Sequence, residues 1–159
     1  MTISGPRLII GVGADYRRDD GVGLAVAAAL QSVAGLTVLS LPGEGTELIN
    51  AWTNPGPPDP DWAEVVVIDA MRADAPPGAI HRFDGLHDPL PVAAFSCSSH
   101  RFGLAEAVEM ARLLGRLPRR LTIIGVVGGD FSQGQGLTPA VEQAAARLIG
   151  ELALELVRG

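Results

Sequence analysis

Aspartates follow two apolar runs whose composition is that of buried strands. Asp19 and Asp20 come after the run 7–12 and a glycine-rich loop, and Asp69 ends the run 64–69. Aspartates before a helix commonly accept backbone N–H bonds as caps, and an aspartate after a strand commonly begins a turn. The carboxyl ends of parallel strands are also the edge at which open α/β folds place their functional sites. Each aspartate therefore has a structural interpretation and a functional one.

A histidine can complete a metal-binding set with these carboxylates. His100 follows a run of small polar residues and precedes a helical pattern. Alone, such a histidine is more often an ordinary loop residue. If the sheet is parallel, however, the loops that carry Asp20, Asp69 and His100 converge on one rim. Two carboxylates and an imidazole suit a divalent transition metal ion and leave coordination positions for other ligands, so these three are the candidate metal ligands and catalytic residues.

Cys97 and His100 form a competing pair, a thiol and a base in one loop. Their spacing does not exclude a cysteine nucleophile, because such pairs are matched in space. The negative field of Asp20 and Asp69 would disfavour the thiolate, which is the reactive form. We therefore expect Cys97 to be a small packing residue that catalysis does not need.

The glycine-rich segment 11–23 invites comparison with the dinucleotide-binding fingerprint. That comparison fails because Tyr16 stands where the third glycine should open the helix. The three aspartates of the segment would also repel phosphate. Nucleotide binding is not expected.

Short β-branched runs alternate with longer helical patterns, which is typical of a parallel sheet covered by helices. Strands are expected at 7–12, 36–41, 64–69 and 121–127, with a further edge strand at 79–83. Helices are expected at 22–34, 47–52, 104–114 and 139–157. The proline-rich loop 53–61 does not divide the chain, because neither flank carries enough elements to fold alone. The prediction is one α/β domain, residues 1–159.

Composition limits the classes of partner. The 159 residues carry a formal net charge of -6, which argues against nucleic acid. Cys97 is the only cysteine, so an intrachain disulfide is impossible and a reducing compartment is the natural interpretation. The start lacks the features of a signal peptide, and no apolar run has the length of a membrane span. We expect a cytoplasmic monomer without membrane insertion.

Several segments together resemble the hydrogenase maturation proteases, which trim the C-terminal tail of the nickel-iron hydrogenase large subunit. The resemblance covers nearly the whole chain and rests on 8–13, 19–23, 66–70, 99–104, 125–131 and 136–141. It implies a three-layer αβα sandwich with a mostly parallel sheet, of the phosphorylase/hydrolase-like kind. It also implies a metal held by Asp20, Asp69 and His100. That metal is nickel supplied by the substrate, so the free enzyme need not hold any.

Two positions depart from the family pattern. Ala14 stands where the family usually has Asn, and the neighbouring Asp15 could supply an equivalent turn bond. The segment 127–129 stands where many relatives carry a Glu, so no functional role is transferred to it. Its glycines predict a flexible wall for the substrate tail.

The resemblance implies an endopeptidase that removes the C-terminal extension of a nickel-loaded large-subunit precursor. No serine-type or cysteine-type triad is evident, so nickel or a nearby carboxylate is expected to polarise the carbonyl or activate water. Asp20 could be a ligand or the base. The alternative function is a non-proteolytic α/β module that binds a metal or an anion at the same rim.

Overall fold

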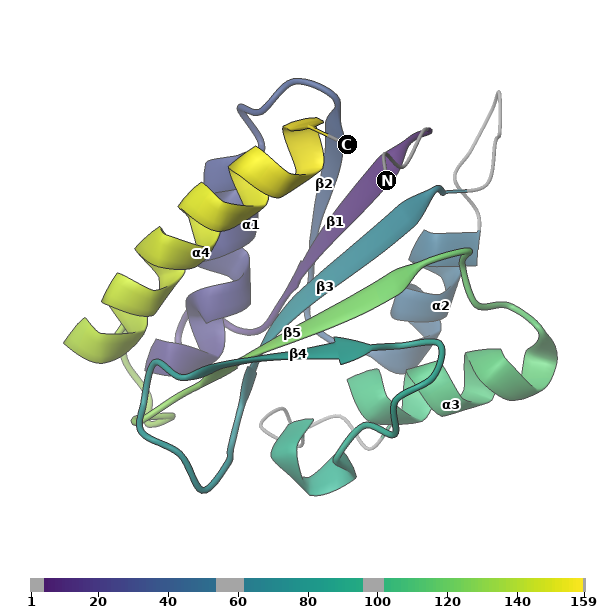
Figure 1. Ribbon diagram of the computed structural model, residues 1–159. Helices are drawn as coiled ribbons and strands as arrows, with labels where there is room; N and C mark the ends of the chain where they lie inside the picture. Colours follow the sequence, from purple (N-terminus) through teal and green to yellow (C-terminus); the bar gives the residue numbers. More distant parts are fainter. Residues whose placement is uncertain (1–4, 54–61, 96–101, 159) are drawn as a thin grey trace.

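The chain forms one five-stranded sheet with helices on both faces (Figure 1). The computed structural model describes residues 5–53, 62–95 and 102–158, with side chains up to Leu156. The strands are β1 (Arg7–Val12), β2 (Leu36–Leu41), β3 (Glu64–Met71), β4 (Ile80–Asp84) and β5 (Leu121–Val127). The helices are η1 (Arg18–Gly21), α1 (Val22–Leu30), α2 (Gly45–Thr53), η2 (Val92–Phe95), α3 (Leu104–Leu114) and α4 (Pro139–Arg158).

The strand order is β2-β1-β3-β5-β4, and every pairing is parallel except the one between β4 and β5. The expected mostly parallel sheet is therefore confirmed, and β4 is the expected edge strand. Strands β1, β2 and β5 and helix α3 have the predicted bounds. None of the helices in the described part of the chain is both long and apolar enough to span a bilayer.

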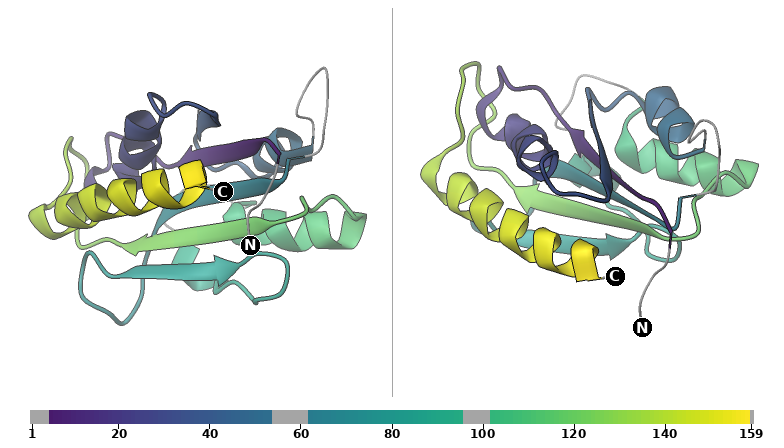
Figure 2. Two further views of the ribbon diagram at one scale, coloured as in Figure 1. Left: turned by 45° about the horizontal axis from the view of Figure 1, so that its top comes forward. Right: turned by 90° about the horizontal axis from the view of Figure 1, so that it is seen from above.

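Helices α2 and α3 cover one face of the sheet and α1 and α4 cover the other, which gives three layers (Figure 2). Successive side chains of a strand point to opposite faces. In β3, Val65 and Val67 therefore pack in the core shared with α2 and α3. Val66 and Ile68 pack in the core shared with α1 and α4. All eight residues of β3 are buried, as expected of a central strand covered on both faces, and this places its far end deep in the molecule.

The bounds of α2, β4 and α4 differ from the expected ones by one or two residues. Two further boundaries, of α1 and β3, are wrong in ways that bear on the site. Helix α1 ends at Leu30, not at residue 34, because the chain turns there. The Val33 N–H donates to the Leu30 carbonyl at 3.0 Å, and Gly35 has φ +88°. Strand β3 continues two residues beyond Asp69, because its pairing with β5 continues. Asp69 is therefore an internal strand residue opposite Gly125.

Candidate active site

The loop after β1 folds back on itself and places Asp20. Gly13 has φ +149°, and a Cβ atom there would lie 1.9 Å from the Asp20 carbonyl oxygen, so only glycine fits. The Ala14 N–H donates to Oδ2 of Asp20 at 3.1 Å. Among the described contacts, Asp20 supplies the turn bond that was expected from Asp15. Asp20 does not cap α1, which begins after Gly21 without a side-chain cap, but it does lie in the first turn of η1.

Close packing of α1 on the sheet brings this loop to β3. A Cβ atom on Gly23 would lie 2.2 Å from the Ile68 carbonyl oxygen, and one on Gly11 would lie 2.3 Å from the Gly23 carbonyl oxygen. The first turn of α1 can therefore rest directly on the backbone of β1 and β3. This contact sets η1 beside the carboxyl end of β3, where Asp20 and Asp69 interact electrostatically.

Both carboxylates are removed from water, since Asp20 is 2% and Asp69 is 6% exposed. Burial, together with the charge of Asp20, raises the pKa of Asp69 well above its ordinary value, against a smaller opposing effect of the Ala70 N–H. Burial also raises the pKa of Asp20, opposed by Arg17, the Ala14 N–H and Arg72. A divalent cation would relieve the cost of ionising both groups. The pair therefore has the chemistry of an incomplete cation site.

The third predicted residue, His100, lies outside the described residues, as does Cys97. On one side of that segment, the Ala94 carbonyl accepts from the N–H of Arg72 at 2.8 Å. On the other side, the Phe102 carbonyl accepts from the N–H of Gly45 at 2.7 Å. Arg72 directly follows β3 and Gly45 begins α2 after β2, so both described flanks are bound at the rim that carries Asp20 and Asp69.

The described residues contain no group of three His, Cys, Asp or Glu side chains that could hold a metal. A complete ligand set thus depends on His100, which stays a prediction.

Asp19 has a role that the sequence did not reveal. Its side chain is fully buried and accepts from the N–H groups of Gly129 at 2.8 Å, Asp130 at 3.0 Å and Thr138 at 2.8 Å. The hydroxyl of Thr138 also donates to it, at 2.8 Å and 3.1 Å. Asp19 is therefore not a helix cap. It fastens η1, and with it Asp20, to the loop between β5 and α4.

The glycines of that loop are tightly packed. A Cβ atom on Gly128 would lie 2.5 Å from the ring of Phe131, and one on Gly129 would lie 2.9 Å from Pro77. The N–H of Gly128 donates to the Met71 carbonyl at 3.1 Å. The predicted flexible wall is therefore wrong, because these glycines allow close contacts that fix the loop.

Comparison with known proteins decides the family. The sequence profile of the hydrogenase maturation protease family matches residues 27–155 of this chain. The chain belongs to the hydrogenase maturation protease family. This membership does not favour the alternative of a non-proteolytic binding module.

Two curated relatives of this family member have related names. The chain is 31% identical over 151 residues to the hydrogenase expression/formation protein HupD of Thiocapsa roseopersicina, covering 93% of this chain and 66% of HupD. It is 28% identical over 142 residues to the hydrogenase 2 maturation protease of Escherichia coli K12, covering 85% of this chain and 80% of the relative. The chain thus spans just under two thirds of the length of HupD.

Solved structures of maturation proteases share the fold. The maturating endopeptidase HybD of Escherichia coli matches with a TM-score of 0.71 at 22% identity, covering 95% of this chain and 94% of HybD. The protease HycI of Thermococcus kodakarensis matches with a TM-score of 0.69 at 20% identity, covering 97% of this chain and 93% of HycI. At these identities the match establishes the α/β fold alone.

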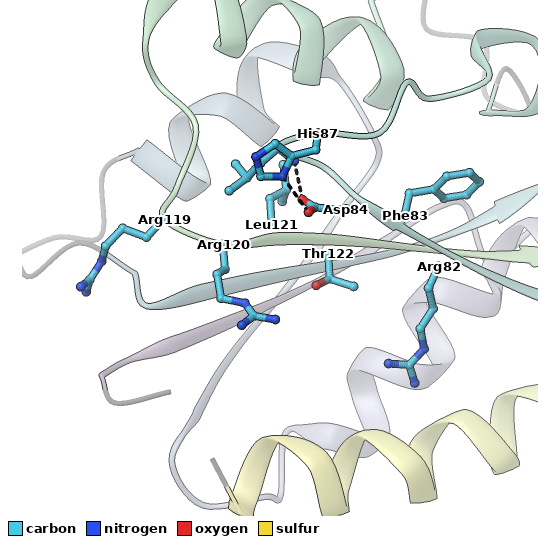
Figure 3. Close-up of a pocket in the computed structure, with 9 residues that line it drawn as sticks. Arg82, Phe83, Asp84, His87, Arg119, Arg120, Leu121 and Thr122 are labelled. Atoms are coloured by element: carbon cyan, nitrogen blue, oxygen red, sulfur yellow. Dashed lines mark hydrogen bonds and ion pairs between the residues drawn. The ribbon is translucent and has the colours of Figure 1, made fainter. Parts of the chain in front are cut away.

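A cavity of 590 Å³ lies at the other end of the sheet (Figure 3). It is lined by the end of β4 and the start of β5, including Arg82, Arg119 and Arg120. Arg82 and Arg119 stand at opposite sides of this view of the cavity (Figure 3). Arg82 is also held by ion pairs with Glu151 and Glu155. The cavity also holds His87 and Asp84, an exposed pair joined at 2.9 Å. It lies away from the rim that carries the buried carboxylates Asp20 and Asp69, so we do not assign the active site to it.

Proposed function

We propose that this family member is an endopeptidase that removes the C-terminal extension of a nickel-loaded nickel-iron hydrogenase large-subunit precursor. It binds the nickel of its substrate through Asp20, Asp69 and His100. The names of the relatives support hydrogenase maturation. The choice of nickel and of these ligands extends beyond the comparisons.

One observation carries the proposal: two buried carboxylates, on the contacting elements η1 and β3, lie near enough at the carboxyl rim of the sheet to interact electrostatically. Burying charge without compensation is costly, and structural packing alone gives no reason to bring a second carboxylate to the first. A cation brought by the substrate compensates both. Since the cation comes with the substrate, only a loaded precursor completes the site.

The reaction is hydrolysis of one peptide bond. The nickel of the substrate would polarise the carbonyl group next to which it is bound, or lower the pKa of a water molecule. Its charge would also favour the ionised forms of Asp20 and Asp69. Asp20 is the better candidate for the base that takes a proton from water, because Arg17 and Arg72 favour its ionised form.

We further propose that the enzyme acts as a monomer in the cytoplasm. The single cysteine suits a reducing compartment. Size-exclusion chromatography with light scattering tests the monomer, and a dimer at working concentration would contradict it.

The decisive experiment compares two forms of one precursor, with and without nickel. Purified enzyme is incubated with each form, and the products are analysed by mass spectrometry. We expect a shortened product from the loaded precursor alone. Equal cleavage of both forms would show that nickel is incidental, and an intact loaded precursor would favour the binding module.

A further inference from the structure

Arg72 is an exposed arginine at the rim of the active site. It lies directly after β3, and its backbone N–H is fixed by the Ala94 carbonyl at 2.8 Å. Its guanidinium carbon lies 4.6 Å from the centroid of the Phe131 ring. Its positive charge acts on Asp20, favouring the ionised carboxylate. The side chain is therefore held by its backbone bond and the Phe131 ring on the rim that carries Asp20.

The hydrogen-bond donors of Arg72 are not used by an acidic side chain of the described residues. Two other arginines, Arg82 and Arg18, do pair with acidic side chains. Arg82 binds Glu155 at 2.9 Å, and Arg18 lies 3.6 Å from Asp130. In the described part of the chain, its guanidinium lies over the ring of Phe131, and a cation over a ring keeps its N–H donors available at the edge of the guanidinium plane.

The ring under Arg72 is itself fixed. Phe131 packs against Gly128, where a side chain would collide with the ring. The preceding residue, Asp130, donates its N–H to the buried carboxylate of Asp19 at 3.0 Å. A guanidinium held on such a support loses little conformational freedom when it binds a ligand, which favours recognition.

We infer that Arg72 binds an oxygen acceptor in the C-terminal segment of the precursor, and this inference rests on the proposed function. A peptide that reaches Asp20 and Asp69 must pass the rim on which Arg72 stands. The acceptor is either the carbonyl oxygen of the cleaved bond, which gains negative charge during the reaction, or another oxygen of the tail. Both are ligands that a guanidinium edge binds through N–H donors.

The test measures kcat and KM for processing of nickel-loaded precursor by the parent enzyme and four variants. Arg72→Gln removes the positive charge and the paired N–H donors of the guanidinium. We expect kcat/KM to fall by about 10-fold to 100-fold, the range for loss of a charged hydrogen-bond donor. Arg72→Lys keeps the charge and should recover part of the loss. Arg82→Gln is the matched control, an exposed arginine far from the site, and should leave kcat/KM within about 2-fold of the parent.

Whether the substitution changes kcat or KM identifies the acceptor. A fall in kcat indicates the carbonyl of the cleaved bond, whereas a rise in KM alone indicates another oxygen of the tail. Phe131→Leu removes the supporting ring and should give a smaller loss of the same kind. If a folded Arg72→Gln enzyme matches the parent, the inference is wrong while the proposed function stands. If the parent leaves loaded precursor intact, the proposed function fails, and the inference with it.

Discussion

A carboxylate as deeply buried as that of Asp69 destabilises the free protein when it ionises. The unfolded chain gives an aspartate a pKa of about 3.9, and burial beside Asp20 raises the pKa of Asp69 well above that in the folded protein. Between the two values the folded state binds more protons than the unfolded state. Stability contributed by this group is therefore lost as the pH rises through that window.

Replacing Asp69 by Asn should consequently stabilise the free enzyme at pH 7, because the amide carries no charge that burial would penalise. The gain should vanish below about pH 4, where both states of the parent are protonated at this position. Processing should be lost at the same time. Chemical denaturation of parent and variant at the two pH values measures the effect.

Asp84 provides the control for this substitution. It is exposed, and its hydrogen bond with His87 lowers its pKa, so Asp84→Asn should bring no gain. A less stable Asp69→Asn variant at pH 7 would show that the carboxylate is already compensated in the free protein.

Among the elements, the contact between α1 and the sheet has the greatest influence on the site. Gly23→Ala would place a methyl carbon 2.2 Å from the Ile68 carbonyl oxygen. The obstacle is backbone, so α1 must move away from β3. We expect a loss of about 2 kcal/mol, within the range of overpacked cores, and a displaced Asp20 with reduced processing.

Gly150→Ala is the matched substitution in α4. Nothing lies within 4 Å of the added carbon, so the higher helix propensity of alanine should stabilise the protein by about 0.5–1 kcal/mol. Thermal unfolding of both variants tests the pair. Equal effects at the two positions would contradict the close approach of α1 to the sheet.

The sequence predicts elements well where local patterns determine them. The bounds of β1, β2 and β5 follow from short apolar runs that end in turn residues. The end of β3 does not, because its last two residues are strand only through their pairing with Val126 and Val127. Pairing partners are not encoded locally, so Asp69 was expected at the end of the strand.

The difference between local and long-range contacts also decides which features of the candidate site could be predicted. Convergence on one rim could be predicted for Asp20 and Asp69, because parallel strands end at a common edge. The role of Asp19 could not, since its partners lie 110 to 119 residues further along the chain. The pattern Asp19-Asp20 before a helix also matches a cap so well that the structural interpretation of Asp19 took precedence.

On the scale of the whole molecule, the two ends of the sheet differ in chemistry. The carboxyl end carries the acidic pair and Arg72, whereas the other end carries the arginine-lined cavity, in which Arg82 is already paired. Helices cover both faces of the sheet between these ends (Figure 2). A large folded substrate that presents a metal and a tail is therefore expected to dock at the carboxyl rim.

Docking through a shared ion makes substrate capture depend on pH. Nickel binds carboxylates and imidazole only in their deprotonated forms, so binding must release any protons that these groups hold. The raised pKa values of Asp20 and Asp69 mean that protonation competes at a higher pH than ordinary aspartates would allow. We expect the affinity for loaded precursor to fall on acidification from pH 7, starting above the ordinary aspartate range.

Calorimetry between pH 5 and pH 8 tests this dependence. It measures the affinity of the parent for loaded and for nickel-free precursor, in buffers of different ionisation enthalpy. Only the affinity for the loaded form should depend steeply on pH, with release of protons on binding.

His100→Ala removes a predicted ligand and should abolish processing of loaded precursor, whereas Cys97→Ser, in the same segment, should process it at nearly the parental rate. If His100→Ala retains activity and Cys97→Ser loses it with the fold intact, the thiol is the catalytic group. The acidic pair would then serve another purpose than holding the nickel of the substrate.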